Sequence, residues 1–218
     1  MTWDEMAPLL WQASGESAVM VAWSTLFTVL FGLPLGVALV VLDRGGLRPM
    51  PALKSVLGFL VNSGRSLPFI VLMIAITPFT RLVAGTTVGT AAFVVPLTVG
   101  AVPFFARLVE TALREVGPDV VQAAQAMGAS RLAVVRKVLL PEALPGLIAG
   151  LTVTVVALIG YSAMAGTLGG GGLGDLAVRY GYQRFETALM IVTVVLLIVI
   201  VQLLQSLGDR VARRLSHK

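Results

Sequence analysis

GPDVVQAAQAMGASRLAVVRKVLLP, residues 117–141, is the one long segment of the chain that is neither a hydrophobic run nor a terminus. Pro118 suits the first turn of a helix, because its missing N–H would be unpaired there in any case. Gly128 is placed to end that helix, Ser130 to cap a second one, and Pro141 to limit the second at its far end. Residues 117–141 therefore predict two short helices between larger hydrophobic segments.

The first of these helices carries a weakly apolar stripe. Val120, Ala124 and Met127 recur at i, i+4 and i+7, whereas Gln122 and Gln125 lie off this line. The spacing predicts a helix with one weakly apolar face.

The composition around this segment is that of a membrane protein. Of 218 residues, 57% are hydrophobic and only 12% are charged, with a mean hydropathy of +0.93, whereas soluble domains carry about 25% charged residues. The chain has no cysteine and one histidine, His217, so we expect neither disulfides nor a metal site. The basic residues are spread over short segments and do not gather on one face, which argues against nucleic-acid binding.

Charged residues divide the chain into hydrophobic segments. A helix needs about 20 residues to cross the hydrocarbon core, and all but one of the uncharged runs are long enough. We therefore expect an all-α, polytopic membrane protein with five transmembrane helices, forming one domain over residues 1–218. The acidic N-terminus lacks the basic region of a signal peptide, so we expect the first span to be retained. The uncharged runs are residues 17–42, 66–80, 82–106, 143–174 and 187–208.

The second run is too short to span by itself. Residues 66–80 would reach only about 22 Å as a helix. We expect this span to use the preceding residues 55–65 as well, which places Arg65 within or near the membrane. An arginine at that depth is a candidate for function, and its alternative is to snorkel to the surface.

The distribution of lysine and arginine predicts the orientation. These residues concentrate in the segments after the first, third and fifth runs, whereas the other segments carry only Arg81, Arg179 and Arg184. Positive charges favour the cytoplasmic side. We therefore expect the N-terminus outside, the C-terminus inside, and residues 117–141 in the cytoplasm.

Small residues at four-residue spacing predict helix packing faces. Gly32 and Gly36 lie in the first span, and Gly146, Gly150 and Thr154 lie in the fourth. Such spacing permits close approach of two backbones, inside the subunit or across a dimer.

Prolines within the spans are expected to kink them or to free backbone carbonyls. They are Pro34, Pro68, Pro78, Pro96 and Pro103.

Motifs for enzymatic chemistry are missing from the sequence. No G-x-x-x-x-G-K-[ST] loop occurs, and the spans contain no H-E-x-x-H, G-x-S-x-G or carboxylate cluster. Gly169, Gly171 and Gly174 match G-x-G-x-x-G, but they follow a membrane span, where this motif does not bind dinucleotides. We expect no catalytic residues, and the chain is predicted not to be an enzyme.

The central segment resembles the EAA loop of ABC importer permeases, in which E-A-A is followed after three residues by Gly and after nine more by I-x-L-P. The matching residues are Gln122, Ala123, Ala124, Gly128, Val138, Leu140 and Pro141. Gln122 replaces the frequent Glu, and Val138 replaces Ile. The resemblance implies that residues 117–141 are the coupling helices that dock on an ATPase subunit.

The whole chain further resembles the five-span permease of bacterial methionine importers, through residues 64–73, 95–110, 136–147 and 160–164. This implies a permease homodimer in the bacterial inner membrane, two ABC ATPase subunits that bind ATP and magnesium, and an extracytoplasmic solute-binding protein. It also implies import of methionine by alternating access, with the choice between D- and L-methionine left open.

A second group of residues is expected along the transport pathway. Tyr161, Ser162 and Met164 lie in the outer half of the fourth span, and Met164 could form a flexible hydrophobic gate. Arg65 and Ser66 resemble the Arg-Ser/Gly-x-Pro turn of amino-acid import permeases. All five could instead be packing residues.

Two alternatives remain for the function. The cargo could be another amino acid or small solute, since residue chemistry alone does not specify methionine. An ATP-independent secondary transporter is a different class, but such a carrier has no need of the segment at residues 117–141.

Overall fold

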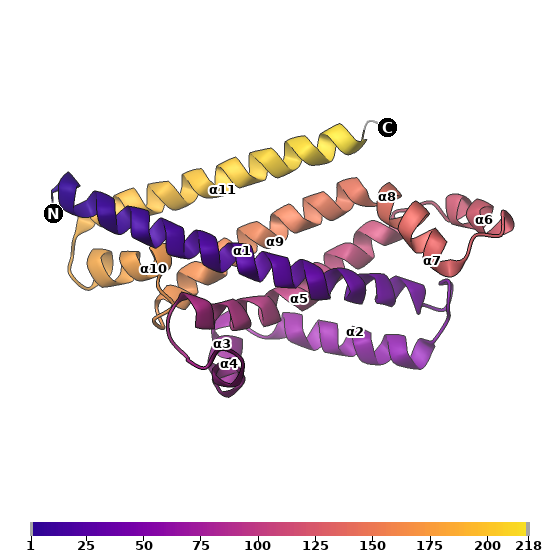
Figure 1. Ribbon diagram of the computed structural model, residues 1–218, viewed down its shortest axis with the longest axis horizontal. Helices are drawn as coiled ribbons and strands as arrows, with labels where there is room; N and C mark the ends of the chain where they lie inside the picture. Colours follow the sequence, from indigo (N-terminus) through magenta and orange to yellow (C-terminus); the bar gives the residue numbers. More distant parts are fainter. Residues whose placement is uncertain (1, 217–218) are drawn as a thin grey trace.

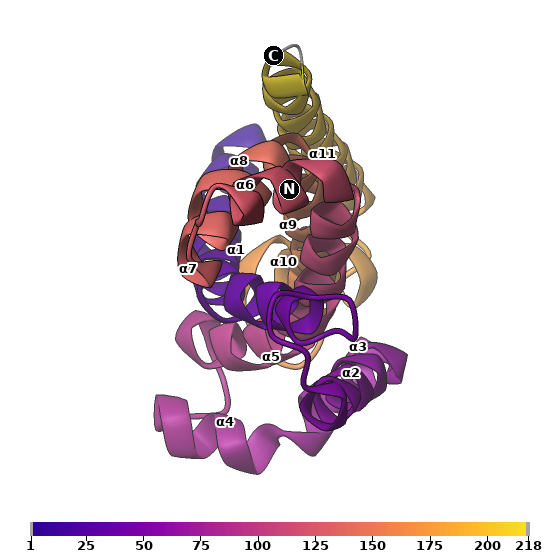
Figure 2. The ribbon, with the colours of Figure 1, turned by 90° about the vertical axis from the view of Figure 1, so that its right-hand side faces the viewer.

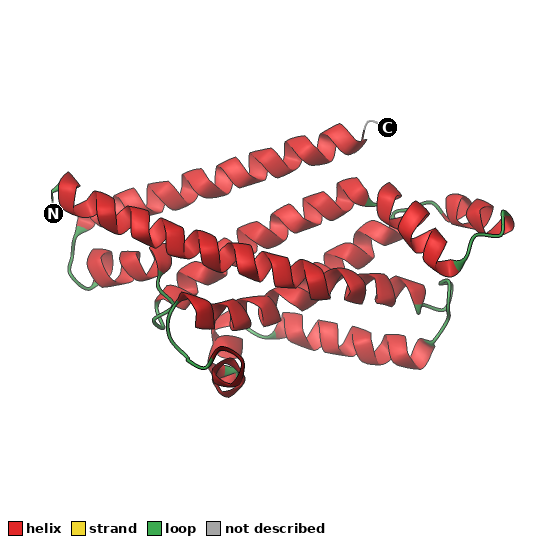
Figure 3. Ribbon diagram, viewed as in Figure 1, coloured by secondary structure: helices red, strands yellow, loops and turns green. Residues whose placement is uncertain are grey.

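The structure, a computed structural model that describes residues 2–216, contains helices joined by loops and no strand over those residues (Figure 3). The predicted all-α fold is confirmed, and the tail residue His217 lies outside the described part. In chain order the helices are α1 (Trp3–Val41), α2 (Pro51–Ser66), α3 (Phe69–Ala75), α4 (Thr77–Ala84), α5 (Thr90–Arg114), α6 (Pro118–Ala126), α7 (Arg131–Val134), a π-helical segment (Val135–Leu139), α8 (Leu140–Glu142), α9 (Leu144–Gly166), α10 (Gly172–Leu176), a second π-helical segment (Ala177–Tyr182) and α11 (Thr187–Ser216).

Four of the described helices, α1, α5, α9 and α11, are long and apolar enough to cross a membrane. The pair α2 and α3 passes the same criterion when taken together, but it is bent by 106°. The five predicted spans are therefore present if this bent pair counts as one.

The long helices lie along a common direction, and the short helices gather at its ends. Helices α6, α7 and α8 lie at one end, whereas α10 and the N-terminus of α1 lie at the other (Figure 1). Helix α4 stands away from the bundle (Figure 2).

Helix α1 packs most extensively on α5, and glycine makes this close approach possible. A Cβ atom on Gly36 would lie 2.5 Å from the Cβ of Val109, and one on Gly32 would lie 2.9 Å from the ring of Phe105. Side chains at these positions would separate the helices. The prediction that these glycines mark packing faces is confirmed inside the subunit.

Helix α9 also packs closely on α5 at glycine residues. A Cβ on Gly146 would lie 3.0 Å from that of Ala112, and one on Gly150 would lie 3.1 Å from that of Leu108. Thr154 is fully buried one turn further along. Helix α5 is therefore the central element on which α1 and α9 both pack.

Helix α1 begins at Trp3, much earlier than the uncharged run from residue 17 predicts. Its first turn is closed by the backbone N–H of Thr2, which donates to Oε2 of Glu5 at 2.8 Å. Met6 and Leu10 are buried and pack in a cluster with α10 and α11. Charged residues end a hydrophobic run but do not end a helix. The start of the uncharged run therefore lies later in the chain than the start of the helix.

The expected continuous second span is wrong, because the chain breaks between α2 and α3. Leu67 has an extended backbone, with φ −79° and ψ 130°, and Pro68 follows it. The ring of a proline disfavours the helical conformation of the residue before it. The helix therefore ends at Ser66, and α3 starts in a new direction.

The other prolines act differently from one another. Pro34 remains inside α1, and Pro96 and Pro103 remain inside α5, whereas Pro78 lies in the first turn of α4. Only the break at Pro68 redirects a span, because neighbouring helices support the backbone around the buried prolines of α5.

The glycine-rich turn after α9 is tied to α1. Oε2 of Glu16 accepts the N–H of Gly172 at 2.7 Å, and Oγ of Ser17 accepts the N–H of Leu173 at 2.9 Å. Gly171 and Gly172 have φ of 76° and 78°, which favours glycine. The turn joins the membrane-length helix α9 to the short helix α10.

Candidate functional site

The end of α6 is a complete helix-termination motif. Gly128 has φ 80°, its N–H donates to the carbonyl of Gln125 at 2.9 Å, and the N–H of Ala129 donates to the carbonyl of Ala124 at 3.1 Å. These two bonds satisfy carbonyls that would otherwise be unpaired at a helix C-terminus. Oγ of Ser130 then accepts the N–H of Ala133 at 3.3 Å and caps α7. The predictions that Gly128 ends the first helix and that Ser130 caps the second are confirmed.

Pro141 does not end the second helix as predicted. The chain passes from α7 through the π-helical segment, where the N–H of Leu140 donates to the carbonyl of Val135, and α8 then includes Pro141. A π-helical turn is wider than an α-helical turn. This accommodates the missing N–H and the ring of the proline without breaking the helix.

The predicted apolar stripe of α6 is not its buried face. Ala124 is buried, but Val120 is 46% and Met127 82% exposed. The contact with the bundle is made by Ala124 and the half-buried Val121, which pack in a cluster that includes Leu139. Val120 and Met127, with the 58% exposed Leu132 of α7, form an apolar outer surface on this end of the molecule, and such surfaces mark interaction sites.

The seven residues expected to couple to an ATPase divide between two sides of this segment. Ala123, Gly128 and Pro141 are exposed, Ala124 is buried, and Val138 and Leu140 are half-buried in the same cluster as Ala124. The seventh, Gln122, is exposed and lines a cavity that is open to the surface.

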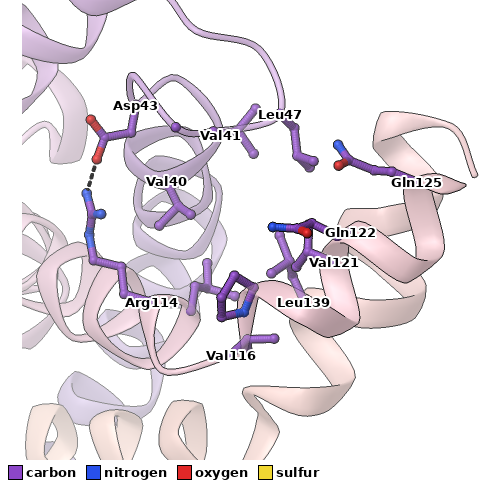
Figure 4. Close-up of a pocket in the computed structure, with 14 residues that line it drawn as sticks. Val40, Val41, Asp43, Leu47, Arg114, Val116, Val121, Gln122, Gln125 and Leu139 are labelled. Carbon is purple, nitrogen blue, oxygen red and sulfur yellow. Dashed lines mark hydrogen bonds and ion pairs between the residues drawn. The ribbon is translucent and has the colours of Figure 1, made fainter.

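This cavity has a volume of about 620 Å³ and lies between α6, the end of α5 and the turn after α1. Gln122 and Gln125 extend into it from α6, and Leu47 lies on the facing wall (Figure 4). Arg114 and Asp43 close its other end. The polar side chains of α6 thus face the end of α5 across an open space.

A network of charged side chains joins α5 to its neighbours beside this cavity. Glu110 is 4% exposed, and its carboxylate accepts hydrogen bonds from Arg107 and from Arg114, the latter at 2.9 Å. Arg107 also donates to Oδ1 of Asn62 on α2 at 2.7 Å, and Arg114 donates to Asp43 after α1. The network therefore ties α5 to both α1 and α2.

Asp43 is strongly stabilised in its charged form. Its pKa is lowered from 3.8 to about 2, mainly by the hydrogen bond from Arg114 and next by that from the backbone N–H of Arg44. Lys54 adds an ion pair at 3.4 Å. The sequence reading missed this network, although the spacing of Arg107, Glu110 and Arg114 at i, i+3 and i+7 is the signal for it.

The structure brings two of the five predicted pathway residues together. Arg65, at the end of α2, and Tyr161, on α9, line one pocket of about 230 Å³. The ring of Tyr161 stacks on that of Phe69, with centroids 4.4 Å apart and planes at 12°. The other residues that line it are Gly64, Leu67, Phe69, Leu72, Gly100 and Phe104.

Ser66, Ser162 and Met164 lie outside this pocket. Oγ of Ser66 donates to the carbonyl of Ser63 at 2.9 Å, and Oγ of the buried Ser162 donates to that of Ile159 at 2.8 Å. Met164 is 39% exposed on the surface of α9. Both serines therefore bond within their own helices, while Met164 is open to its surroundings.

Metal-binding groups are not assembled in the described part of the chain. Over residues 2–216, no three His, Cys, Asp or Glu side chains lie close enough together to hold an ion.

Comparison with known proteins identifies the family. Residues 28–217 match the family described as the inner membrane component of binding-protein-dependent transport systems. The chain belongs to this family.

Individual relatives are similar over nearly the whole chain. The probable D-methionine transport system permease protein MetI of Vibrio cholerae is 53% identical over 96% of this chain and 93% of its own length. The methionine import system permease protein MetP of Bacillus subtilis is 43% identical, over 96% of this chain and 94% of its own. A chain in a solved structure of inward-facing MetNI methionine ABC transporter is 44% identical, with a TM-score of 0.96 and 99% of each chain covered.

Proposed function

We propose that this chain is the permease subunit of an ATP-driven ABC importer for methionine. The relatives named for methionine transport support this cargo, since the similarity extends over nearly all of the chain. The observation that carries the proposal is the segment containing α6 and α7, which projects at one end of the bundle (Figure 1). A transporter that works without an ATPase partner would not need such a segment.

The apolar outer surface of Val120, Met127 and Leu132 is the proposed docking surface for the ATPase. Ala123 is exposed beside it, and its small side chain allows a partner to approach the helix closely. Two permease chains would form a homodimer on two ATPase subunits, which bind ATP and magnesium, and a solute-binding protein would deliver cargo on the opposite side. The sequence contains no phosphate-binding loop, so this subunit would transport without hydrolysing ATP.

We infer that α6 and α7 face the cytoplasm and that the chain lies in the bacterial inner membrane, with the N-terminus outside. The positive charges support this orientation. The turn after α1, with Arg44 and Arg48, lies at the same end of the bundle as α6, and α11 ends in a segment that contains Arg213 and Arg214.

The proposed mechanism is alternating access, in which ATP-driven closure of the partner subunits moves α6 together with the spans. The contacts inside the subunit would transmit a movement of α6 to the membrane-spanning helices. Ala124 and Val121 pack with Leu113 of α5, and the charge network ties α5 to α1 and α2. The similarity to the inward-facing MetNI chain supports an inward-facing state for this conformation.

Arg65 and Tyr161 are the proposed pathway residues that share a pocket. Met164, which is exposed near the end of α9, is the proposed gate residue, because a methionine side chain can adapt to several packing arrangements. The hydroxyl groups of Ser66 and Ser162 bond within their own helices, which favours a packing role for these two residues.

Transport by the assembled complex tests this proposal. The chain would be purified with its ATPase, placed in vesicles and supplied with the binding protein and labelled methionine. We expect uptake with ATP and none with ADP. Uptake driven by a proton or sodium gradient without ATP would contradict the proposal, and preferential uptake of another amino acid would contradict the cargo.

A pair of substitutions tests the proposed docking surface for the ATPase. Met127→Asp places a charge in the centre of the apolar outer surface and should release the ATPase on copurification. Val88→Asp changes a residue that is 60% exposed in the loop before α5, at the opposite end of that helix from α6, and should not. Equal recovery of the ATPase with both variants would contradict the assigned surface.

A further inference from the structure

The pocket between α2, α3, α5 and α9 combines one cation with aromatic walls. Arg65 contributes the cation. Among residues 2–216 its guanidinium has no ion pair with a carboxylate, whereas Arg107 and Arg114 are both paired. The five N–H donors of Arg65 are therefore available to a ligand, in a fork that matches the two oxygens of a carboxylate.

The other residues that line the pocket are two glycines, two leucines and three aromatic residues. Phe69 and Tyr161 form a stacked pair, and Phe104 lines the pocket with them. Aromatic rings contact aliphatic chains well and interact favourably with the sulfur of a thioether. These walls suit an unbranched apolar side chain.

The size of the pocket limits the ligand. Its volume is about 230 Å³, whereas sites for drug-sized molecules have about 300–1,000 Å³. Gly100 keeps this space open, because a Cβ there would lie 3.2 Å from the ring of Phe69 and 3.3 Å from Leu72. The pocket therefore fits a molecule of the size of one amino acid.

We propose that this pocket is a binding site for a zwitterionic amino acid with an unbranched thioether side chain. Its α-carboxylate pairs with Arg65, and its side chain lies against the rings of Phe69 and Tyr161. The inference rests on the proposed function, which provides such an amino acid as cargo, and adds the site that contacts it within the membrane subunit.

A thiol reporter tests the site directly, because the natural chain has no cysteine. Leu67→Cys places one thiol on the pocket wall of the complete complex in vesicles, and its rate of reaction with a water-soluble maleimide is measured. L-methionine at about ten times its dissociation constant should slow labelling about tenfold. Methioninol, which has an alcohol in place of the carboxylate, should not protect.

Substitutions of Arg65 distinguish protection by binding in this pocket from general effects of methionine on labelling. In the Leu67→Cys background, Arg65→Gln should abolish protection and Arg65→Lys should retain part of it. Arg81→Gln removes an exposed cation from α4, outside the pocket, and should leave protection unchanged. Phe104→Cys provides a second reporter if the first variant fails to assemble.

The possible results distinguish the pocket from the function on which it rests. Equal protection by methioninol, or full protection in Arg65→Gln, would overturn the assigned carboxylate contact. The site would be overturned if methionine protected neither reporter while the unsubstituted complex imported methionine with ATP. The proposed function would then remain intact. A lack of ATP-driven uptake in the unsubstituted complex would instead overturn the proposed function.

Discussion

Phe69 of α3 and Tyr161 of α9 lie face to face, with ring centroids 4.4 Å apart and ring planes inclined by 12°. This stack joins α3, the short helix that follows the break after α2, to the long helix α9. It also forms one wall of the pocket that contains Arg65.

Removing the stack should impair transport more than removing the tyrosine hydroxyl. An aromatic pair contributes about 0.5–1.5 kcal/mol beyond its buried area. We expect Tyr161→Ala to lower ATP-driven methionine uptake about tenfold and Tyr161→Phe to remain near the unsubstituted rate. A Tyr161→Phe defect as large as that of Tyr161→Ala would show that the hydroxyl, and not the stack, is the important group.

The contact between α1 and α5 should not tolerate a methyl group at Gly36. Its Cβ would lie 2.5 Å from that of Val109, and such overpacking costs about 1–3 kcal/mol. Gly36→Ala should lower the melting temperature of the purified protein. Gly15→Ala is the matched control in the same helix, because no atom lies within 4 Å of its Cβ, and it should be neutral or stabilising. Equal melting temperatures for the two variants would contradict this packing.

The buried carboxylate of Glu110 should be essential for stability. Glu110→Ala removes the shared partner of Arg107 and Arg114. Because these two arginine side chains are 28% and 45% exposed, we expect a cost of about 1–3 kcal/mol. Glu115→Ala, one turn beyond on an exposed position, should change the free energy of unfolding by less than about 0.5 kcal/mol. Denaturant unfolding measures both, and similar values would mean that the network contributes nothing.

The ion pair of Asp43 predicts a dependence of stability on pH. Its pKa is lowered from 3.8 to about 2, so its contribution is fully present above about pH 4 and is lost as the pH falls through about 2. Because the pair is partly solvent-exposed, we expect about 1 kcal/mol at neutral pH. The difference in unfolding free energy between the unsubstituted protein and Asp43→Asn should shrink over this range. If this difference in unfolding free energy stayed constant with pH, Asp43 would be excluded as the source of the pH dependence.

The left-handed backbone of Gly128 should limit what can replace it. With φ 80°, asparagine is accepted far better than a β-branched residue. Cargo-stimulated ATPase activity of the complex should survive in Gly128→Asn and fall in Gly128→Val. Normal stimulated activity in Gly128→Val would count against the role of this turn in coupling.

Local chemistry made several features of the fold predictable from the sequence. Hydropathy located the long helices, and the glycines at 32 and 36 indicated a packing face. Gly128 and Ser130 could be assigned because helix caps depend on residues within one turn.

Other features depend on contacts between distant segments and were not predictable. Hydropathy indicated one continuous second span, whereas the restriction that Pro68 places on Leu67 breaks it. The apolar stripe of Val120 and Met127 was visible in the sequence, but hydropathy does not show whether such a stripe is buried or, as here, exposed. Arg65 and Tyr161 were each proposed for the pathway, but only the fold shows that they share a pocket.

The hydrogen bonds from Glu16 and Ser17 to the glycine turn also constrain how the protein can be assembled. Their partners, Gly172 and Leu173, are 156 residues further along the chain. The carboxylate of Glu16 in α1 can meet these N–H groups only after α9, which precedes them in the chain, has been synthesised. This turn therefore closes only after α10 has been made, and a chain truncated before α10 would leave the Glu16 carboxylate with the side chain of Gln12 as its donor.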